Sequence, residues 1–215
     1  MKRVLIGYST CPWTRAAFEA QGHEVWTCDL LPARDNSPRH FQCDIWAVLN
    51  HTWDFAVLHP MCTYLTTSAA WAYIDGPYHQ KVKPSTLVGA ARRAARRAAI
   101  ENFRRLLALP YPVAIENPGG SFVSRAIRPP SQVVQPYQFG DDASKATGFW
   151  LSDGVPKLMP TRYCAPRVVN GRPRWANQTD GGHNRLTPGP LRWLERSATF
   201  PGIAAAMGAQ WGAWL

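Results

Sequence analysis

Short apolar runs alternate with polar, turn-rich segments along the first 120 residues of the chain. Apolar runs rich in β-branched residues predict buried strands, whereas apolar positions that recur every three to four residues predict helices. Strands alternating with helices are typical of a parallel α/β sheet. The pattern predicts strands at residues 3–8, 23–30, 53–60 and 111–118, and helices at residues 12–21 and 85–109.

The first thirty residues have the form of a nucleotide-binding unit in a doubly wound sheet. Asp29 ends the second predicted strand, 22 positions after Gly7, which is close to the spacing at which an acid meets a ribose hydroxyl. The segment "GYSTCPWTR" has one glycine where a dinucleotide fingerprint has three. We therefore expect a nucleoside-type cofactor without a pyrophosphate rather than a dinucleotide.

The composition changes after residue 119, where proline, glycine and arginine become frequent and helical periodicity fades. Periodicity returns in "PGIAAAMGAQWG" near the end of the chain. We predict an α/β core over residues 1–150, a small irregular insert over 151–195 and a C-terminal helix over 196–215 that packs back on the core.

The charge balance favours a polyanionic partner. The chain has 24 Lys and Arg residues against 14 Asp and Glu, a net charge of +10. Such an excess attracts nucleic acid through counterion release, although a basic protein without a nucleic-acid role remains the alternative. Arginines 92, 93, 96 and 97 have no acids near them in the sequence, which favours phosphate contacts over an ordinary solvated helix face.

Composition also limits the class of protein. No apolar run approaches the roughly 18 residues of a membrane span, and "VLIG" is too short for a signal peptide, so we expect a soluble cytoplasmic protein. The five cysteines are widely spaced and form no Cys-x-x-Cys pair. Neither a disulfide framework nor a metal site is expected.

Two predicted strands end in candidate catalytic groups. Cys62 follows "AVLHPM", and Glu116 lies in "AIENPGG". Because a doubly wound sheet places its active site at the carboxyl ends of its strands, we expect Cys62 and Glu116 to face each other across one crevice. The alternatives are a small buried thiol for Cys62 and a capping or salt-bridged carboxylate for Glu116.

A thiol beside a carboxylic acid has the chemistry needed to saturate a pyrimidine ring. Cys62 would add as a thiolate to carbon 6, with a helix amino terminus or positive charge lowering the thiol pKa. Glu116, kept protonated in a partly dry crevice, would donate to ring nitrogen 3. Carbon 5 then becomes nucleophilic and can take up a one-carbon unit.

These segments resemble, in order and context, those of the DNA cytosine-5 methyltransferases, and most closely the compact members often carried by bacteriophages. The segment "VLIGYSTCPWTRAAFEAQGHEVWTCDLLP" is similar to the family's first strand, cofactor loop, helix and acid-bearing second strand. "CDI" resembles its adenine-reading acid, "HPMCTYLTTS" its Pro-Cys nucleophile loop and "IENPGG" its Glu-Asn-Val motif. "QPYQFG…KATGFWL" and "FPGIAAAM" extend the resemblance over nearly the whole chain.

The resemblance implies a Rossmann-like, methyltransferase-type fold and assigns roles to individual residues. Cys62 becomes the nucleophile, and Glu116 becomes the group that holds cytosine N3 and N4. Asp29 would contact the ribose hydroxyls of S-adenosylmethionine, and Asp44 its adenine amine. The alternative for both acids is a helix cap or a turn. The other implied cofactor contacts are Gly7, Tyr8 and Pro60.

DNA is the implied partner, and the protein would act in the host cytoplasm if a phage encodes it. The target base has to leave the stack, at a cost of a few kcal/mol. The insert would serve as a small target-recognition segment, too short for a long recognition sequence. The predicted substrate contacts are Asn117, Pro118, Lys145, Arg93 and Arg97.

Three departures from the family pattern keep alternatives open. The cofactor loop is poor in glycine, Met61 stands between Pro60 and Cys62, and no arginine motif is obvious, so that Lys145 or Arg128 would replace it. One alternative is an aldehyde donor that yields hydroxymethylcytosine without S-adenosylmethionine. The other is a non-catalytic DNA-binding protein on the same fold.

Other polar and aromatic residues receive ordinary interpretations. His59 is expected to be packed or solvated rather than a base, and His183 to lie in a turn. Most tryptophans are expected in the core, but Trp175 and Trp193 lie among arginines and are predicted to stack on bases.

Overall fold

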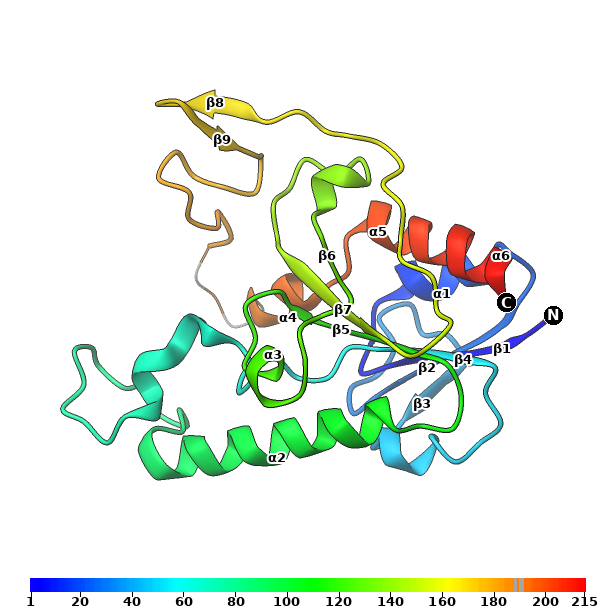
Figure 1. The fold of residues 1–215 in the computed structure, drawn as a ribbon, viewed down its shortest axis with the longest axis horizontal. Helices are drawn as coiled ribbons and strands as arrows, with labels where there is room; N and C mark the ends of the chain where they lie inside the picture. The colour runs from blue at the N-terminus through cyan, green and yellow to red at the C-terminus, as the bar shows by residue number, and fades with distance from the viewer. Residues whose placement is uncertain (188, 190–191) are drawn as a thin grey trace.

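The computed structural model describes residues 1–187, 189 and 192–215. Figure 1 shows a central sheet with helices on both sides and a small two-stranded ribbon that projects from it. The strands are β1 (Arg3–Gly7), β2 (Glu24–Asp29), β3 (His40–Gln42), β4 (Phe55–Leu58), β5 (Val113–Pro118), β6 (Gln132–Val134), β7 (Thr147–Leu151), β8 (Arg167–Val169) and β9 (Arg172–Arg174). The helices are α1 (Pro12–Glu19), α2 (Gly89–Leu107), α3 (Val123–Ala126), α4 (Arg192–Ser197), α5 (Pro201–Ala206) and α6 (Gly212–Trp214), with short helical turns η1 (Ile45–Ala47), η2 (Thr67–Tyr73), η3 (Pro136–Gln138) and η4 (Met207–Trp211).

Seven strands form the main sheet in the order β3-β2-β1-β4-β5-β7-β6. The first five of these pair in parallel, whereas β7 runs antiparallel to both β5 and β6. The strand order reverses between β1 and β4, and ligands bind at the carboxyl ends of the strands at such a switch point. The predicted α/β, doubly wound fold class is confirmed by this topology.

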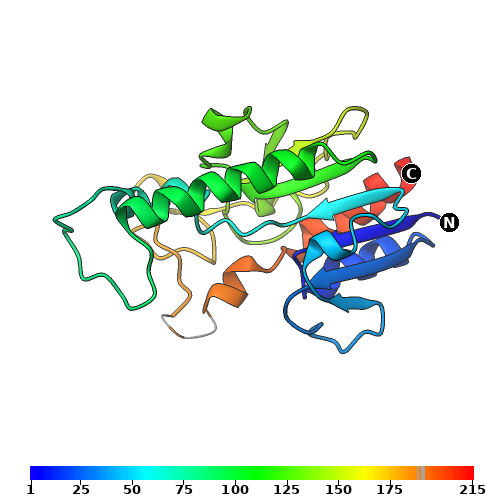
Figure 2. The ribbon, with the colours of Figure 1, turned by 90° about the horizontal axis from the view of Figure 1, so that it is seen from below.

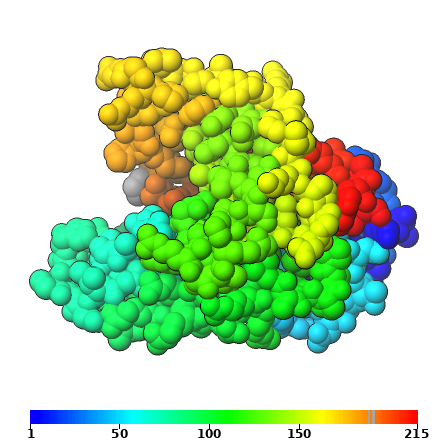
Figure 3. Space-filling model, in the orientation of Figure 1, coloured from blue at the N-terminus to red at the C-terminus, as the bar shows by residue number. Residues whose placement is uncertain are grey.

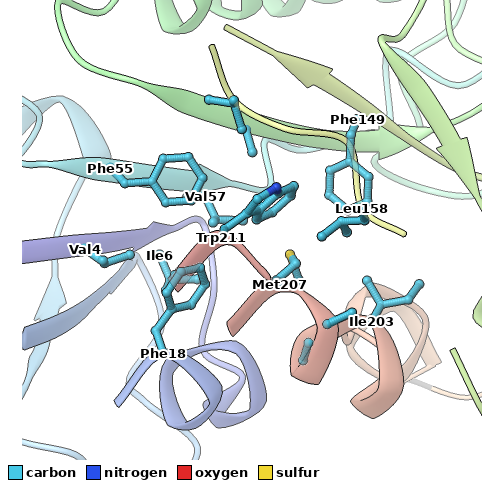
Figure 4. Close-up of a cluster of buried hydrophobic side chains, with 14 of the residues drawn as sticks. Val4, Ile6, Phe18, Phe55, Val57, Phe149, Leu158, Ile203, Met207 and Trp211 are labelled. Atoms are coloured by element: carbon cyan, nitrogen blue, oxygen red, sulfur yellow. The ribbon is translucent and has the colours of Figure 1, made fainter. Parts of the chain in front are cut away.

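Each face of the sheet carries its own apolar core, because successive strand side chains point to opposite faces. Val4 and Ile6 pack on the face covered by α1 and the C-terminal helices, whereas Leu5 packs on the α2 face. Figure 4 shows the first core, in which the rings of Phe55 and Trp211 meet edge to face with centroids 5.6 Å apart. Figure 2 shows α2 running beside β5 on the other face.

The six elements predicted for the first 120 residues are all present, and the periodic C-terminal segment forms α5, η4 and α6 against α1. Helix α2 begins later than predicted, because Ser85 has a φ of 64°, which a right-handed helix excludes. Strands β6 and β7 were not predicted. Strand β7 is buried along its whole length, so it has no polar and apolar alternation to reveal it.

Two segments project from the body of the molecule, and the outline in Figure 3 is indented between them. One is the segment between β4 and α2, and the other contains β8, β9 and the residues after them. Asn170 and Gly171, with φ values of 49° and 72°, form the turn between β8 and β9. The insert thus has the predicted loops and short strands, while the boundaries at 150 and 195 stay predictions.

Two further properties concern residues 1–187, 189 and 192–215 only. Within these residues, no helix is long and apolar enough to cross a membrane. Within the same residues, no three His, Cys, Asp or Glu side chains gather where they could hold a metal ion.

Candidate active site at the carboxyl ends of β4 and β5

Strands β4 and β5 bring a histidine and a carboxylate side by side. The register pairs Leu58 with Ile115, so the next residues, His59 and Glu116, are neighbours on one face of the sheet. Nδ1 of His59 lies 3.0 Å from Oε2 of Glu116, and the exposed fractions of the two side chains are 9% and 17%. Cys62 follows three residues after His59 in the loop after β4, and it is near enough to Glu116 for the carboxylate charge to raise the pKa of its thiol.

The crevice holds Glu116 as a carboxylate. Burial raises the pKa of Glu116, but the hydrogen bond from His59 and the positive charges of Lys145 and His59 outweigh burial and lower the pKa below its ordinary value. The expectation of a protonated acid is therefore wrong for the free protein. The reason is that the crevice offers the carboxyl a donor and cations rather than an apolar wall.

Cys62 is an exposed residue, but its thiol is not activated in the free protein. Loss of hydration around the thiol raises the pKa of Cys62, and the Glu116 charge raises it further, whereas Lys145 and Arg196 act in the opposite direction. We expected positive charge to lower this pKa, and the net direction is opposite. The thiol is therefore mostly protonated near neutral pH and needs a base or a bound substrate to ionise it.

Lys145 supplies the positive charge of the crevice. Its charge lowers the pKa of both Glu116 and Cys62, and its Nζ donates to a backbone carbonyl of α4 at 3.1 Å. Arg128 was the other candidate to replace the missing arginine motif. Its guanidinium donates to a serine hydroxyl and to a carbonyl of β7, at 2.9 and 2.8 Å, so Arg128 holds the sheet edge together instead.

Asn117 ties the nucleophile loop to β5. Its Nδ2 donates to the carbonyl of Pro60 at 2.9 Å, and the side chain is 1% exposed. Among the described residues, neither Oδ1 of Asn117 nor Nε2 of His59 has a hydrogen-bond partner, although both atoms are buried. Unpartnered buried polar atoms are rare and costly, so two of them near one sheet edge indicate a place for a ligand or water. Pro118 pairs with Thr147 in the ladder between β5 and β7.

A cavity of about 310 Å³ lies on the α2 side of the sheet edge, beside the nucleophile loop. The hydroxyl of Tyr8 accepts a hydrogen bond from Asn102 at 3.2 Å, and Asn102 in turn accepts one from the indole of Trp46 at 2.9 Å. Burial raises the pKa of Tyr8 to about 12, so its hydroxyl stays protonated. The cavity is lined by Tyr8, Pro60, Met61, Tyr64, Leu65, Ala95, Ala98, Ala99 and Asn102.

Gly7, another predicted cofactor contact, serves the packing of the core. A Cβ at this position would lie 2.6 Å from a methyl group of Leu58 and 2.7 Å from one of Ile45. The carbonyl of Gly7 accepts the amide of His59 at 3.0 Å. Gly7 therefore lets β1 and η1 approach each other, and it presents no side-chain surface to a cofactor.

Asp29 and Asp44 both hold local turns. Oδ1 of Asp29 accepts the amide of Leu31 at 3.0 Å, and Oδ1 of Asp44 accepts the amide of Trp46 at 2.8 Å. Within the described part of the chain, the second oxygen of each carboxylate makes no hydrogen bond. The turn-forming interpretation is correct for both acids, and their contacts to a ribose and an adenine stay predictions.

The arginines at the start of α2 differ in their surroundings. Arg93 donates to the carbonyl of Tyr73 at 2.8 Å and to Asp75 at 3.0 Å, so the premise that no acid lies near it is wrong. Arg92 is only 5% exposed and lies over the ring of Tyr73. Arg97 is exposed, as a phosphate contact requires.

His59 is the site residue that sequence reasoning missed. Its position directly before Pro60 and one residue beyond a strand end was the available signal. What the sequence did not reveal was the register between β4 and β5, which decides that Glu116 is its neighbour.

The two tryptophans predicted to stack on bases also differ. Trp175 is 8% exposed and stacks on Tyr137 with ring centroids 4.2 Å apart, so the prediction is wrong for this residue. Trp193 on α4 is 57% exposed, and its role stays a prediction. His183 directly follows the turn at residues 180–182, and its amide donates to the hydroxyl of Thr179 at 3.1 Å.

Comparison with known proteins gives similarity at the level of solved structures. No protein-family model and no curated protein sequence matches the chain. One similar structure is an E. coli prophage-encoded protein described as a candidate DNA modification methyltransferase, with 14% identity, a TM-score of 0.43, and coverage of 79% of this chain and 56% of that one. Another is the S. pombe Dnmt2 methyltransferase, with 16% identity, a TM-score of 0.38, and coverage of 74% and 51%.

The chain thus spans about half the length of the solved structures that it resembles. Both are described as methyltransferases.

Proposed function

We propose that this protein modifies cytosine at carbon 5 in DNA through a covalent adduct with Cys62, most simply by transferring a methyl group from S-adenosylmethionine. The observation that carries the proposal is that Cys62, Glu116 and Lys145 lie near enough to one another, at the carboxyl ends of β4 and β5, for the Glu116 and Lys145 charges to change the pKa of the Cys62 thiol and for the Lys145 charge to change that of Glu116. An exposed thiol, a fixed carboxylate and a cation supply a nucleophile, a base-holding group and charge compensation.

In the proposed reaction, Cys62 forms a bond to carbon 6 of cytosine. The thiol loses its proton, the sulfur electron pair forms the S–C6 bond, and ring electrons move toward N3, which takes up a proton. Glu116 accepts a hydrogen bond from the N4 amine and shares the proton at N3. Lys145 offsets the negative charges of the Glu116 carboxylate and the Cys62 thiolate. Carbon 5 would then form a bond to the methyl group, and the sulfur of the donor would leave with the electron pair of its methyl bond. Carbon 5 then loses its hydrogen as a proton and N3 gives up the proton that it took, while the S–C6 bond breaks and its electron pair returns to the Cys62 sulfur.

The residues around the α2-side cavity fit the nucleoside part of a methyl donor. Its walls are mainly apolar, with Tyr8 and Asn102 at one side, which suits a purine ring. Asp44 and Asp29 end neighbouring segments of the sheet edge, and each has a carboxylate oxygen to accept an amine or a ribose hydroxyl. S-adenosylmethionine, when bound, supplies an electrophilic methyl group. Pro60 lines this cavity two residues before Cys62, so donor and nucleophile would be adjacent.

The charge distribution supports DNA as the substrate. The net charge of +10 favours a phosphate backbone, and both projecting segments carry exposed basic residues. The target base would leave its stack to reach the crevice. These exposed residues are Lys81 and Lys83 in the segment between β4 and α2, and Arg167, Arg172 and Arg185 in the segment that contains β8 and β9; Arg97 on α2 is exposed as well.

One observation favours the second candidate, transfer to an aldehyde that yields hydroxymethylcytosine. In the loop after β1, the amide of Ser9 donates to the carbonyl of Cys28, the amide of Cys11 donates to the hydroxyl of Ser9, and Pro12 has no N–H. This loop therefore offers few amides to the carboxylate of an amino-acid-containing donor. An aldehyde needs no such cradle, because carbon 5 adds to its carbonyl carbon and the oxygen takes a proton.

The test uses single- and double-stranded DNA containing 5-fluorocytosine. Fluorine cannot leave carbon 5 as a proton, so the Cys62 adduct persists once a group has been transferred. We expect a covalent complex with S-adenosylmethionine, and a complex only with formaldehyde would favour the second candidate. The mass of the base isolated from ordinary DNA identifies the transferred group.

The matched control is Cys62→Ala, compared with Cys164→Ala. If wild-type protein and Cys62→Ala give the same result in every arm, the nucleophile assignment is wrong. DNA binding without a covalent adduct in any arm would instead favour the non-catalytic DNA-binding alternative.

A further inference from the structure

His59 is fixed in place by three neighbouring strands. Its amide donates to the carbonyl of Gly7 in β1 at 3.0 Å. The next residue, Pro60, is tied to β5 through the 2.9 Å bond from Asn117. The backbone of His59 is therefore anchored on both sides, and its side chain is only 9% exposed, which leaves the imidazole little room to turn away from Glu116.

The only hydrogen bond that His59 makes through its side chain, among the described residues, is the one to Glu116. Nδ1 lies 3.0 Å from Oε2, and Nε2 is buried without a partner in the described part of the chain. The other charged or titratable groups around the pair are Lys145 before β7, Arg196 on α4 and the Cys62 thiol. Within the described part of the chain, the Glu116 carboxylate is therefore the one hydrogen-bond partner of the His59 imidazole.

We propose that His59 is the positioning residue of Glu116: Nδ1–H donates to Oε2, fixes the plane of the carboxylate and leaves Oε1 to receive the target base. This inference rests on the proposed function, in which Glu116 holds cytosine N3 and N4. It adds a residue that neither the composition nor the motif pattern of the chain assigns to the reaction.

His59 can position Glu116 because a hydrogen bond to one carboxylate oxygen restricts rotation about the last side-chain torsion. A carboxylate without a partner rotates about its last torsion, so its oxygens spread over many directions. A donor at one oxygen selects one orientation and lowers the cost of keeping the charge in a sheltered place. Partners that orient a reacting side chain in this manner are commonly worth about 10- to 100-fold in activity or affinity.

The first experiment measures the Glu116 carboxyl directly in the free protein. Its pKa is followed by carbon-13 NMR in wild type, His59→Gln, His59→Leu and His59→Asn, with His51→Gln as the control on the opposite edge of the sheet. We expect His59→Leu to raise the pKa of Glu116 by about one unit or more, since a sheltered carboxylate loses its donor. His59→Gln, which keeps an N–H donor, should give a smaller rise.

Identical Glu116 titrations in wild type and His59→Leu would overturn the proposal. If His59→Leu does not fold, His59→Asn decides, because its shorter side chain removes the contact but remains polar. A histidine that served packing alone would leave this titration unchanged in His59→Asn.

The second experiment measures exchange of the carbon 5 hydrogen of cytosine in DNA for deuterium. Adduct formation makes carbon 5 nucleophilic toward D⁺, so exchange reports the adduct whatever the donor. We expect His59→Leu to slow exchange by about 10- to 100-fold, with partial recovery in His59→Gln and unchanged DNA affinity. Exchange as fast in His59→Leu and His59→Asn as in wild type would overturn the proposal.

The two experiments separate two kinds of failure. If wild-type protein catalyses no exchange, the cytosine chemistry is wrong, whereas the NMR titration still decides whether His59 positions Glu116. If exchange is present and the titration does not respond to His59, only the role of His59 is wrong.

Discussion

At the carboxyl edge of the sheet, polar side chains in the half formed by β4 and β5 have different hydrogen-bond partners from those in the half formed by β1 and β2. At the ends of β4 and β5, His59 and Glu116 bond to each other across two strands, and polar atoms of His59 and Asn117 remain buried and unpartnered in the described part of the chain. After β1 and at the end of β2, the Ser9 hydroxyl and the Asp29 carboxylate accept amides only two residues further along the chain. The first arrangement is formed by tertiary structure and the second by the local chain.

The difference indicates which half is specialised for chemistry. A polar group that satisfies its own turn contributes to stability and needs no ligand, whereas a buried unpartnered atom gains a hydrogen bond only when something binds. The β4–β5 half therefore has the features of a reaction site. The β1–β2 half combines ordinary turns with the largely apolar cavity beside Tyr8.

The sharpest test of this contrast is the removal of the nucleophile. Cys62→Ala should reduce carbon 5 exchange in DNA by more than about a thousandfold, because no other group can form the adduct. Asp29→Asn, which changes the other half of the edge, should leave exchange nearly unchanged. Deuterium incorporation measured by mass spectrometry checks both, and equal losses in the two variants would break the comparison.

The next largest effect is expected from Glu116. Glu116→Gln should slow exchange by about 10²- to 10³-fold, since the amide cannot share a proton with N3 as the carboxylate does. The control is Glu101→Gln, which changes an exposed carboxylate on α2 that pairs with Arg104 at 3.3 Å. Exchange rates at a fixed protein concentration, together with DNA affinity, show whether Glu116→Gln slows the chemical step or weakens DNA binding.

A substitution in the cavity beside Tyr8 should weaken cofactor binding and leave carbon 5 exchange almost unchanged, the reverse of the Cys62 and Glu116 variants. Ala98→Leu adds a side chain at an exposed position that lines this cavity, and we expect about tenfold weaker binding of S-adenosylmethionine with little effect on exchange. Ala94→Leu, also exposed on α2 but outside the cavity lining, is the matched control. Titration calorimetry measures the affinity, and equal affinities in both variants would remove the cavity from the donor site.

The smallest effect concerns the pH dependence of Cys62 alkylation. The Glu116 charge helps to raise the pKa of the Cys62 thiol, so the reactive thiolate is scarce at neutral pH and increases as pH rises. Glu116→Gln removes that charge, which lowers the thiol pKa and should speed alkylation by iodoacetamide about three- to tenfold at pH 7.5. Mass spectrometry of the Cys62 peptide measures the rate. Slower alkylation in Glu116→Gln would show that the Glu116 charge does not raise the pKa of the Cys62 thiol.

Sequence reasoning located the strand ends correctly, because the apolar runs before Cys62 and Glu116 are local signals that need no tertiary information. It also expected Asp29 and Asp44 to form turns as an alternative, which they do. It gave the wrong direction for the Cys62 pKa, since hydration loss depends on how distant segments cover the loop.

Arg93 and Trp175 illustrate the same limit. Asp75, which pairs with Arg93, is 18 residues away in the sequence, and the loop that brings it back has no periodic pattern. Trp175 is covered by Tyr137, 38 positions earlier, and no local signal predicts that stacking. Both contacts arise from chain segments whose course is set by packing.

The sequence by itself determined the α/β class, the alternation of strands and helices, and the presence of a thiol and a carboxylate at two strand ends, because hydrophobic periodicity and turn residues act over a few positions. Tertiary structure alone decided that His59 meets Glu116, that Glu116 is ionised, and that Gly7 belongs to the core. Those outcomes depend on strand register, burial and charges brought together from distant segments. Local patterns carry none of these quantities.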